Sequence, residues 1–113
     1  MLRIATAFTL LLAAAPAAAG GASNFSLVNG TGGAVAQLSI RRAGTPDWKP
    51  LGATPAPGAS ASVNFSDPDC AFDIRARGAD GQPITWAGVN LCGAKSVTLR
   101  KDGSAGAWVD YDQ

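Results

Sequence analysis

The sequence lacks several side chains on which enzymes commonly depend. It contains no histidine, and all eight of its acidic residues are aspartates. Its two cysteines, Cys70 and Cys92, form an isolated pair, which in an oxidising compartment is far more often a disulfide than a metal or redox site. Serine-histidine and cysteine-histidine catalytic pairs and histidine-zinc sites are therefore excluded. We expect no enzymatic activity, no cofactor and no bound metal.

The chain also lacks an excess of charge of either sign. Nine lysines and arginines face eight aspartates, and removal of Arg3 with the N-terminal segment leaves a net charge of about zero. No field then attracts nucleic acid or anionic lipid. After residue 20 no apolar run is long enough to span a bilayer. We therefore expect neither a nucleic-acid partner nor a membrane span in the mature chain.

The N-terminal segment has the organisation of a signal peptide. Arg3 precedes an apolar run over residues 4–15, which has the length of a signal-peptide core and is too short for a membrane span. Small residues that fit signal peptidase follow, and we place cleavage after Ala19. The sequence thus predicts a signal peptide, 1–19, and one β-domain, 20–113, in the periplasm or outside the cell.

The predicted disulfide between Cys70 and Cys92 suits a mature domain of this size. A chain of about 94 residues builds only a modest core, so a covalent link becomes useful. Closing a loop of this length would stabilise the fold by roughly 3 kcal/mol. The role of the cysteines is therefore expected to be structural.

Short segments of alternating apolar and polar residues dominate the chain after residue 20, and helix signals are nearly absent. Turn residues separate these segments about every ten positions. Seven short strands are predicted, at 24–28, 35–40, 60–66, 72–77, 84–91, 96–100 and 107–111. Their number and spacing predict an all-β domain. It is either an antiparallel β-sandwich of the immunoglobulin-like type or a small β-barrel.

The fourth and fifth predicted strands form a hairpin around Gly81. Symmetric pairing sets the two cysteines opposite each other but turns Val89 and Leu91 away from the core. A β-bulge at Ala87–Gly88 would return both side chains to the core face. We expect this bulge, with Cys92 just past the regular pairing.

Residues 43–59 are rich in proline and glycine, which predicts an ordered loop over the sheet rather than a central strand. The loop carries Asp47, Trp48 and Lys49. Trp48 either closes one end of the core or offers an aromatic contact to a ligand or partner. These three residues are candidate binding residues.

Three aspartates, Asp67, Asp69 and Asp73, lie close together in the sequence. They could supply a hydrolase with paired carboxylates or a calcium ion with oxygen ligands, but aspartates are also common in turns. We keep Asp67 and Asp69 as candidate binding residues. Asp73 and Arg75 share the outward face of one strand, and we interpret them as an exposed ion pair, with a functional polar pair as the alternative.

Five short patterns in residues 24–99 resemble those of a known group of proteins. They are Phe25-x-Leu27-x-Asn29-x-Thr31-Gly32, Trp48-x-x-Leu51-Gly52, Pro57-Gly58, Cys70-x-x-Asp73-x-Arg75 and Trp86-x-x-Val89-Asn90-Leu91-Cys92. With these the chain resembles small exported bacterial proteins of unknown function. The resemblance implies a periplasmic or secreted β-domain and carries no catalytic residues. The leader departs from some relatives because it lacks paired arginines.

Together these patterns predict a non-enzymatic periplasmic or secreted binding module for an unidentified protein or small ligand of the cell envelope. The Trp48 loop and the turn from Asp67 to Asp69 are expected to make the contact. One alternative is a disulfide-tied hydrolase inhibitor, which needs a protruding Trp48 loop. Another is a carboxylate- or metal-dependent hydrolase, which needs the aspartates to converge in one cleft.

Overall fold

The computed structural model describes residues 21–103 and 106–112, and the predicted signal peptide lies outside them. In these residues the chain forms eight β-strands: β1 (Ala22–Gly30), β2 (Ala36–Arg42), β3 (Lys49–Pro50), β4 (Ser60–Asp67), β5 (Ala71–Arg77), β6 (Pro83–Asn90), β7 (Ser96–Asp102) and β8 (Gly106–Asp112). The described part of the chain contains no helix with the length and apolarity needed to cross a membrane.

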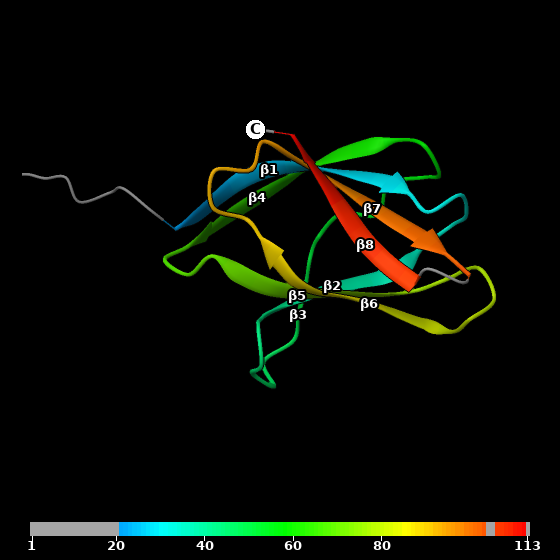
Figure 1. Cartoon of the computed structure of the whole chain (residues 1–113), viewed down its shortest axis with the longest axis horizontal. Helices are drawn as coiled ribbons and strands as arrows, with labels where there is room; N and C mark the ends of the chain where they lie inside the picture. The colour runs from blue at the N-terminus through cyan, green and yellow to red at the C-terminus, as the bar shows by residue number, and fades with distance from the viewer. Residues whose placement is uncertain (1–20, 104–105, 113) are drawn as a thin grey trace, which may run out of the picture.

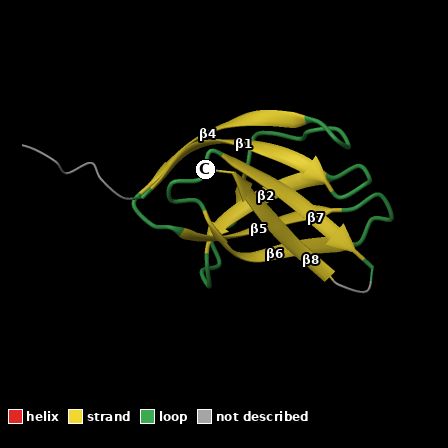
Figure 2. Cartoon of the chain, turned by 45° about the horizontal axis from the view of Figure 1, so that its top comes forward, coloured by secondary structure: helices red, strands yellow, loops and turns green. Residues whose placement is uncertain are grey.

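The strands form two four-stranded sheets that pack face to face (Figure 1, Figure 2). Sheet A has the order β4-β1-β7-β8, and sheet B has the order β3-β2-β5-β6. The predicted all-β sandwich is confirmed, and the barrel is wrong because the sheets stay separate. Neighbouring strands are antiparallel except β1 and β7, which run parallel, and β1 lies between β4 and β7.

The core lies between the two sheets and follows the alternation of the strands. Its largest fully buried side chains are Trp86, Phe72, Leu27, Ile74, Leu91 and Leu99. Each such side chain contributes about 1.5–3 kcal/mol by leaving water. The indole of Trp86 in sheet B donates a hydrogen bond of 2.8 Å from Nε1 to the carbonyl oxygen of Arg100 in sheet A. The one polar atom of this buried ring is thereby satisfied.

The hairpin of β5 and β6 contains the predicted bulge. Ile74 pairs with Trp86, but Phe72 pairs with Val89, so β6 has an extra residue between these pairs. Gly88 adopts a φ of 65°, which glycine tolerates without steric cost. The bulge at Ala87–Gly88 is confirmed, and Val89 returns to the core as expected.

The turn of this hairpin lies slightly earlier than predicted. Ala76 pairs with Ile84, so the pairing is centred on Asp80 rather than on Gly81. The reason is local, because the Gly78 N–H donates to the carbonyl oxygen of Gln82 at 2.9 Å and closes the turn.

The predicted disulfide between Cys70 and Cys92 is confirmed. It lies at the open end of the hairpin, where the Leu91 N–H donates to the carbonyl oxygen of Cys70 at 2.9 Å. Cys92 follows the end of β6, as expected, and also pairs with Ala22 of β1 in an isolated bridge. The disulfide therefore ties the hairpin beside the start of sheet A.

The two margins of the sandwich differ. At one margin β6 and β8 are linked, since the Asn90 N–H donates to the Tyr111 hydroxyl at 2.9 Å. At the other margin the outer strands are β4 and the two-residue β3, which pairs with β2 inside the predicted loop. The prediction of a loop was wrong at this point. Pro50 is tolerated there because β3 is an edge strand.

Candidate functional site

An open pocket of about 610 Å³ lies at the margin formed by β3 and β4. Four of the five candidate residues line it, namely Asp47, Trp48, Lys49 and Asp67. The fifth, Asp69, does not line it but is linked to it through Arg42. The structure thus brings together the loop around Trp48 and the turn after β4, which are about twenty residues apart in the sequence.

The floor of the pocket is apolar. Ile40 and Phe72 are buried, and Phe65 of the edge strand β4 is half-buried beside them. The ring of Phe65 packs edge-to-face against Phe25 and Phe72, with centroid distances of 6.1 and 5.2 Å. Phe65 is therefore held by the core on one side and faces the pocket on the other.

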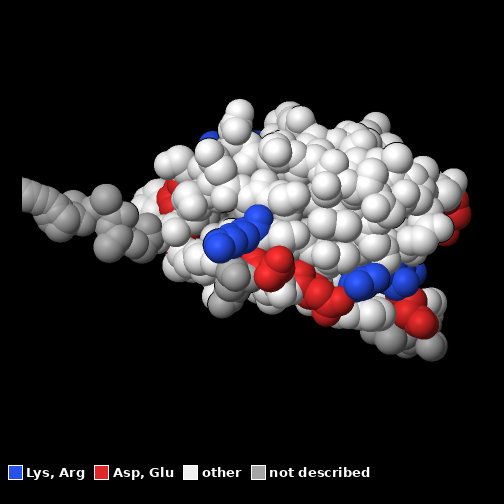
Figure 3. Space-filling view, turned by 90° about the horizontal axis from the view of Figure 1, so that it is seen from above, with Lys and Arg blue, Asp and Glu red and all other residues white. Residues whose placement is uncertain are grey.

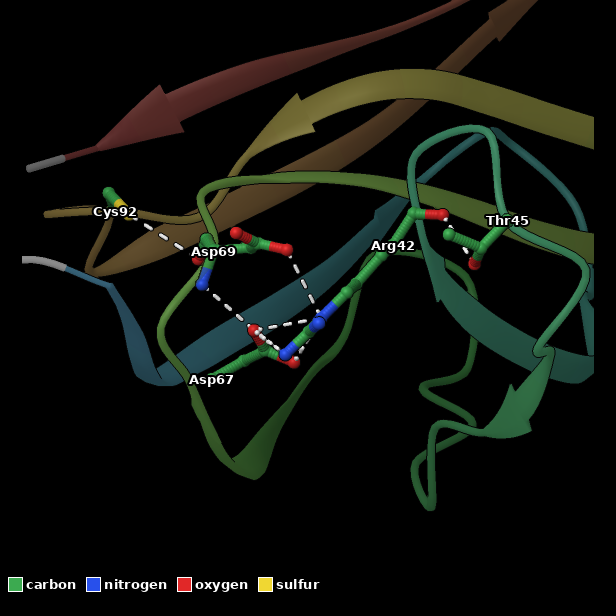
Figure 4. Close-up of polar contacts among 5 residues, drawn as sticks. All are labelled: Arg42, Thr45, Asp67, Asp69 and Cys92. Carbon is green, nitrogen blue, oxygen red and sulfur yellow. Dashed lines mark hydrogen bonds and ion pairs between the residues drawn. The ribbon is translucent and has the colours of Figure 1, made fainter.

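Arg42 at the rim of the pocket holds the turn after β4 (Figure 4). Its Nε lies 3.2 Å from both carboxylate oxygens of Asp67 and 3.2 Å from Oδ2 of Asp69. The Asp69 N–H in turn donates to Oδ1 of Asp67 at 2.8 Å. That hydrogen bond, with help from Arg42, lowers the pKa of Asp67. Asp67 therefore remains an anion paired with a cation and is unsuited to act as a general acid.

Asp73 lies apart from Asp67 and Asp69. It is only 5% exposed and accepts hydrogen bonds from Arg41 Nε at 2.8 Å, from the Gly88 N–H at 3.0 Å and from the Gly44 N–H at 3.4 Å. Burial alone raises the pKa of Asp73, but these donors together lower it. Asp67 and Asp69 converge only on the guanidinium of Arg42, and Asp73 does not join them because it is paired with Arg41.

The interpretation of Asp73 and Arg75 as an exposed ion pair is wrong. Asp73 pairs with Arg41 of the neighbouring strand instead, because the bulge directs the Gly88 N–H onto its carboxylate and draws it into the sheet. Arg75 forms no ion pair with any carboxylate of residues 21–103 and 106–112. It packs on Trp48.

Trp48 lies between two arginines. Its ring centroid is 4.5 Å from the guanidinium carbon of Arg41 and 4.0 Å from that of Arg75. The register explains the position: Lys49 pairs with Ile40, so Trp48 falls beside Arg41 on the outer face of sheet B. Trp48 is half-buried and outside the core cluster, so the interpretation as a lid on the core is wrong.

Sequence reasoning missed the arginines of this region. Neither Arg41 nor Arg42 was among the predicted binding residues, yet each holds a carboxylate. The sequence does contain a signal, which is the pair of consecutive arginines at the end of a strand. Because neighbouring residues of a strand face opposite sides, this pair could have indicated one cation on each side of sheet B.

The aspartates do not form a metal site. Residues 21–103 and 106–112 contain no group of three or more cysteine or acidic side chains placed to hold a metal ion. The carboxylates of Asp67 and Asp69 face the guanidinium of Arg42 (Figure 4). That cation occupies the position in which a calcium ion would have to sit.

The outer faces of the two sheets differ in charge. The face of sheet A is largely uncharged, and most of the Lys, Arg and Asp side chains seen in this view lie in a band along one margin (Figure 3). Arg100 and Asp110, on the neighbouring strands β7 and β8, form an ion pair of 2.9 Å. The outer face of sheet B instead presents Arg41 and Arg75, with Trp48 against both.

Comparisons with known proteins show the fold of the chain. No protein-family model and no curated protein matches it. A solved structure described as the NMR structure of the protein from Eubacterium rectale matches with a TM-score of 0.56 and 20% identity, over 88% of this chain and 96% of that chain. At this identity the likeness concerns the fold alone, and the chain shares the β-rich architecture of that bacterial protein.

Proposed function

We propose that this protein is a non-enzymatic binding module of the periplasm or the extracellular space, and that the pocket between β3 and β4 receives its ligand or partner. The observation that carries the proposal is the meeting of the loop around Trp48 and the turn at Asp67 in one open pocket. An apolar floor beside a charged rim is the usual composition of a binding site.

The location follows from two features. The Cys70–Cys92 disulfide indicates an oxidising environment. The predicted signal peptide, residues 1–19, would deliver the chain to such a compartment. Intact-mass measurement of the exported protein tests this part of the proposal, because cleavage after Ala19 predicts a defined mass.

The rim suggests what the pocket binds. Arg42 is already paired with Asp67 and Asp69, whereas Lys49 forms no ion pair of 4 Å or less within the described residues. Its ammonium group helps to lower the pKa of Asp67 through its charge but forms no ion pair with it, so it can still meet an acidic group of a ligand, while Phe65 offers an apolar surface. The pocket therefore suits a ligand or protein segment that carries an apolar group next to a carboxylate or another anion.

Charge reversal at the rim tests the proposal. The full chain, exported with its own leader and purified, is used to capture ligands from a cell-envelope extract, in parallel with Lys49→Glu. Lys95→Glu is the matched control, because Lys95 is also exposed but lies outside the pocket. We expect the wild type and the control to retain the same species and Lys49→Glu to lose it. Equal capture by all three proteins would contradict the proposal.

A hydrolase inhibitor is the second candidate, and the shape of the β2–β3 connection favours it. This segment projects away from the body of the sandwich (Figure 1). It is fixed at its base, since the Thr45 N–H donates to the carbonyl oxygen of Arg42 and the Ala43 N–H to that of Ala71, both at 3.1 Å. Inhibition of a panel of envelope hydrolases that is lost in Trp48→Ala would support this alternative over simple binding.

A further inference from the structure

We propose that the outer face of sheet B carries a second site, which binds a small dianion, either a phosphate monoester or a dicarboxylate, on the guanidiniums of Arg75 and Arg77. A separate depression of about 390 Å³ lies there. Its lining residues are Gln37, Ser39, Arg75, Ala76, Arg77 and Pro83. No residue lines both this depression and the pocket between β3 and β4, although Trp48 of that pocket contacts Arg75.

The depression carries two positive charges without a matching carboxylate. Arg75 and Arg77 form no ion pair with any carboxylate that the structure describes. Among the nearby acidic groups, Asp73 is paired with Arg41, and Asp80 accepts a hydrogen bond from the Gln82 N–H in the turn. A ligand with two negative charges is therefore the complement of this depression.

Both guanidiniums are held in place before any ligand arrives. The guanidinium carbon of Arg75 lies over the ring of Trp48, 4.0 Å from its centroid, and Arg77 donates from Nη1 to the carbonyl oxygen of Gly81 at 2.7 Å. A guanidinium stacked on a ring still presents its N–H groups at its edge, in the geometry that carboxylate and phosphate oxygens accept. This preorganisation lowers the entropy cost of binding.

The backbone beneath the depression is strained. Gln37 has a φ of 55°, the one positive value at a residue other than glycine in the described chain. It lies in a bulge of β2, since Ala36 pairs with Arg77 and Ser39 with Arg75, leaving one extra residue in β2. Such strain is common at binding sites. Gln37 and Ser39 line the depression together with the two arginines, and the Ser39 hydroxyl donates to the carbonyl oxygen of Gln37 at 3.4 Å.

Titration with two simple probes tests the site. Inorganic phosphate and succinate are added separately to the full processed protein at constant ionic strength and about pH 8, where phosphate is a dianion. Amide NMR spectra are recorded at each step. We expect saturable shifts at Gln37, Ser39 and residues 75–77 with at least one probe. Saturation by phosphate alone assigns the site to phosphate monoesters, and saturation by succinate alone assigns it to dicarboxylates.

Matched arginine substitutions give the control. Arg75→Gln and Arg77→Gln should each weaken binding by about tenfold, since each removes a charge-assisted contact. Arg100→Gln should leave the affinity unchanged, because Arg100 lies in sheet A and is paired with Asp110. The amide spectra also report whether each variant is folded. Shifts that do not saturate, or that respond equally to Arg100→Gln, would overturn the proposal.

Discussion

Arg41 and Arg42 are neighbours in β2, yet they meet different surroundings on opposite sides of the strand. Arg41 is paired with the buried Asp73 on the outer face of sheet B. Arg42 reaches across the margin of the sandwich to Asp67 and Asp69, and its side chain is 48% exposed. The two arginines offer a comparison of the same side chain in a buried and in an exposed ion pair.

The comparison indicates which contacts support the fold and which support the rim of the pocket. Asp73 also accepts two part-buried backbone N–H groups, from Gly88 and Gly44, so its loss would leave these donors without their partner. The Arg42 cluster is open to water, where ion pairs contribute little to stability. It lies next to the disulfide, since Asp69 precedes Cys70 and its carbonyl oxygen is 3.6 Å from Cys92 Sγ (Figure 4).

Removal of the disulfide should have the largest effect and should act on the exposed cluster first. The double variant Cys70→Ser, Cys92→Ser is expected to lose roughly 3 kcal/mol of unfolding free energy, which corresponds to a fall of about 15 °C in Tm. Calorimetry measures the loss, and amide exchange should accelerate more at Asp69 than at Asp73. Equal acceleration at both positions would show that the two sites are not independent.

Asp73→Asn should have the next largest effect. It removes the charge opposite Arg41, and we expect a loss of about 2 kcal/mol, or about 10 °C in Tm. Asp67→Asn is the matched change in the exposed pair and should lower Tm by no more than about 3 °C. Thermal unfolding of both variants measures the difference. A Tm loss in Asp67→Asn as large as in Asp73→Asn would remove the distinction between the two pairs.

Acid should weaken the buried pair. The pKa of Asp73 is lowered in the folded protein, so its contribution to stability is present above the unfolded value of about 3.9 and is lost as the pH falls through the folded value. We expect the Tm difference between the wild type and Asp73→Asn to shrink below about pH 4. Denaturation of both proteins at a series of pH values around pH 4 measures this Tm difference. A Tm difference that stays constant in acid would contradict the link between stability and the protonation of Asp73.

Trp48→Ala should have a smaller effect on stability than Asp73→Asn. The ring stacks on Arg41 and Arg75 near the surface, and we expect a loss of about 1 kcal/mol, or about 5 °C in Tm. Trp108→Ala is the matched control, because Trp108 is 42% exposed and lies on the other sheet. Trp108→Ala should lower Tm less. A larger effect of Trp108→Ala would show that the stack on Trp48 contributes nothing.

Much of the fold could be predicted from local patterns. The alternation of apolar and polar residues from Phe72 to Ala76 identified the face of this segment that packs in the core. In the next strand, symmetric pairing would turn Val89 and Leu91 away from the core, and this mismatch indicated the bulge at Ala87–Gly88. The two-residue strand β3 could not be predicted, because Lys49–Pro50 has no apolar alternation. It is extended only because the edge of β2 offers it hydrogen-bonding partners.

The candidate site was predicted only in part. The residues around Trp48 and Asp67 were named from the sequence, because aromatic side chains in loops and aspartates in turns are locally visible. The partners of those residues were not. Asp73 was expected to pair with Arg75, two positions away, and instead pairs with Arg41, which is 32 positions away.

The sequence by itself determined seven of the eight described strands, the core face of each, the cysteine pair and the bulge, because these follow from side-chain periodicity and turn residues along one segment. Only the tertiary structure decided which carboxylate each arginine meets and where the pocket lies. Ion pairs join segments from different strands, and their geometry depends on strand order and register. A bulge that shifts the register by one residue is enough to bury Asp73 and leave Arg75 without a carboxylate among the described residues.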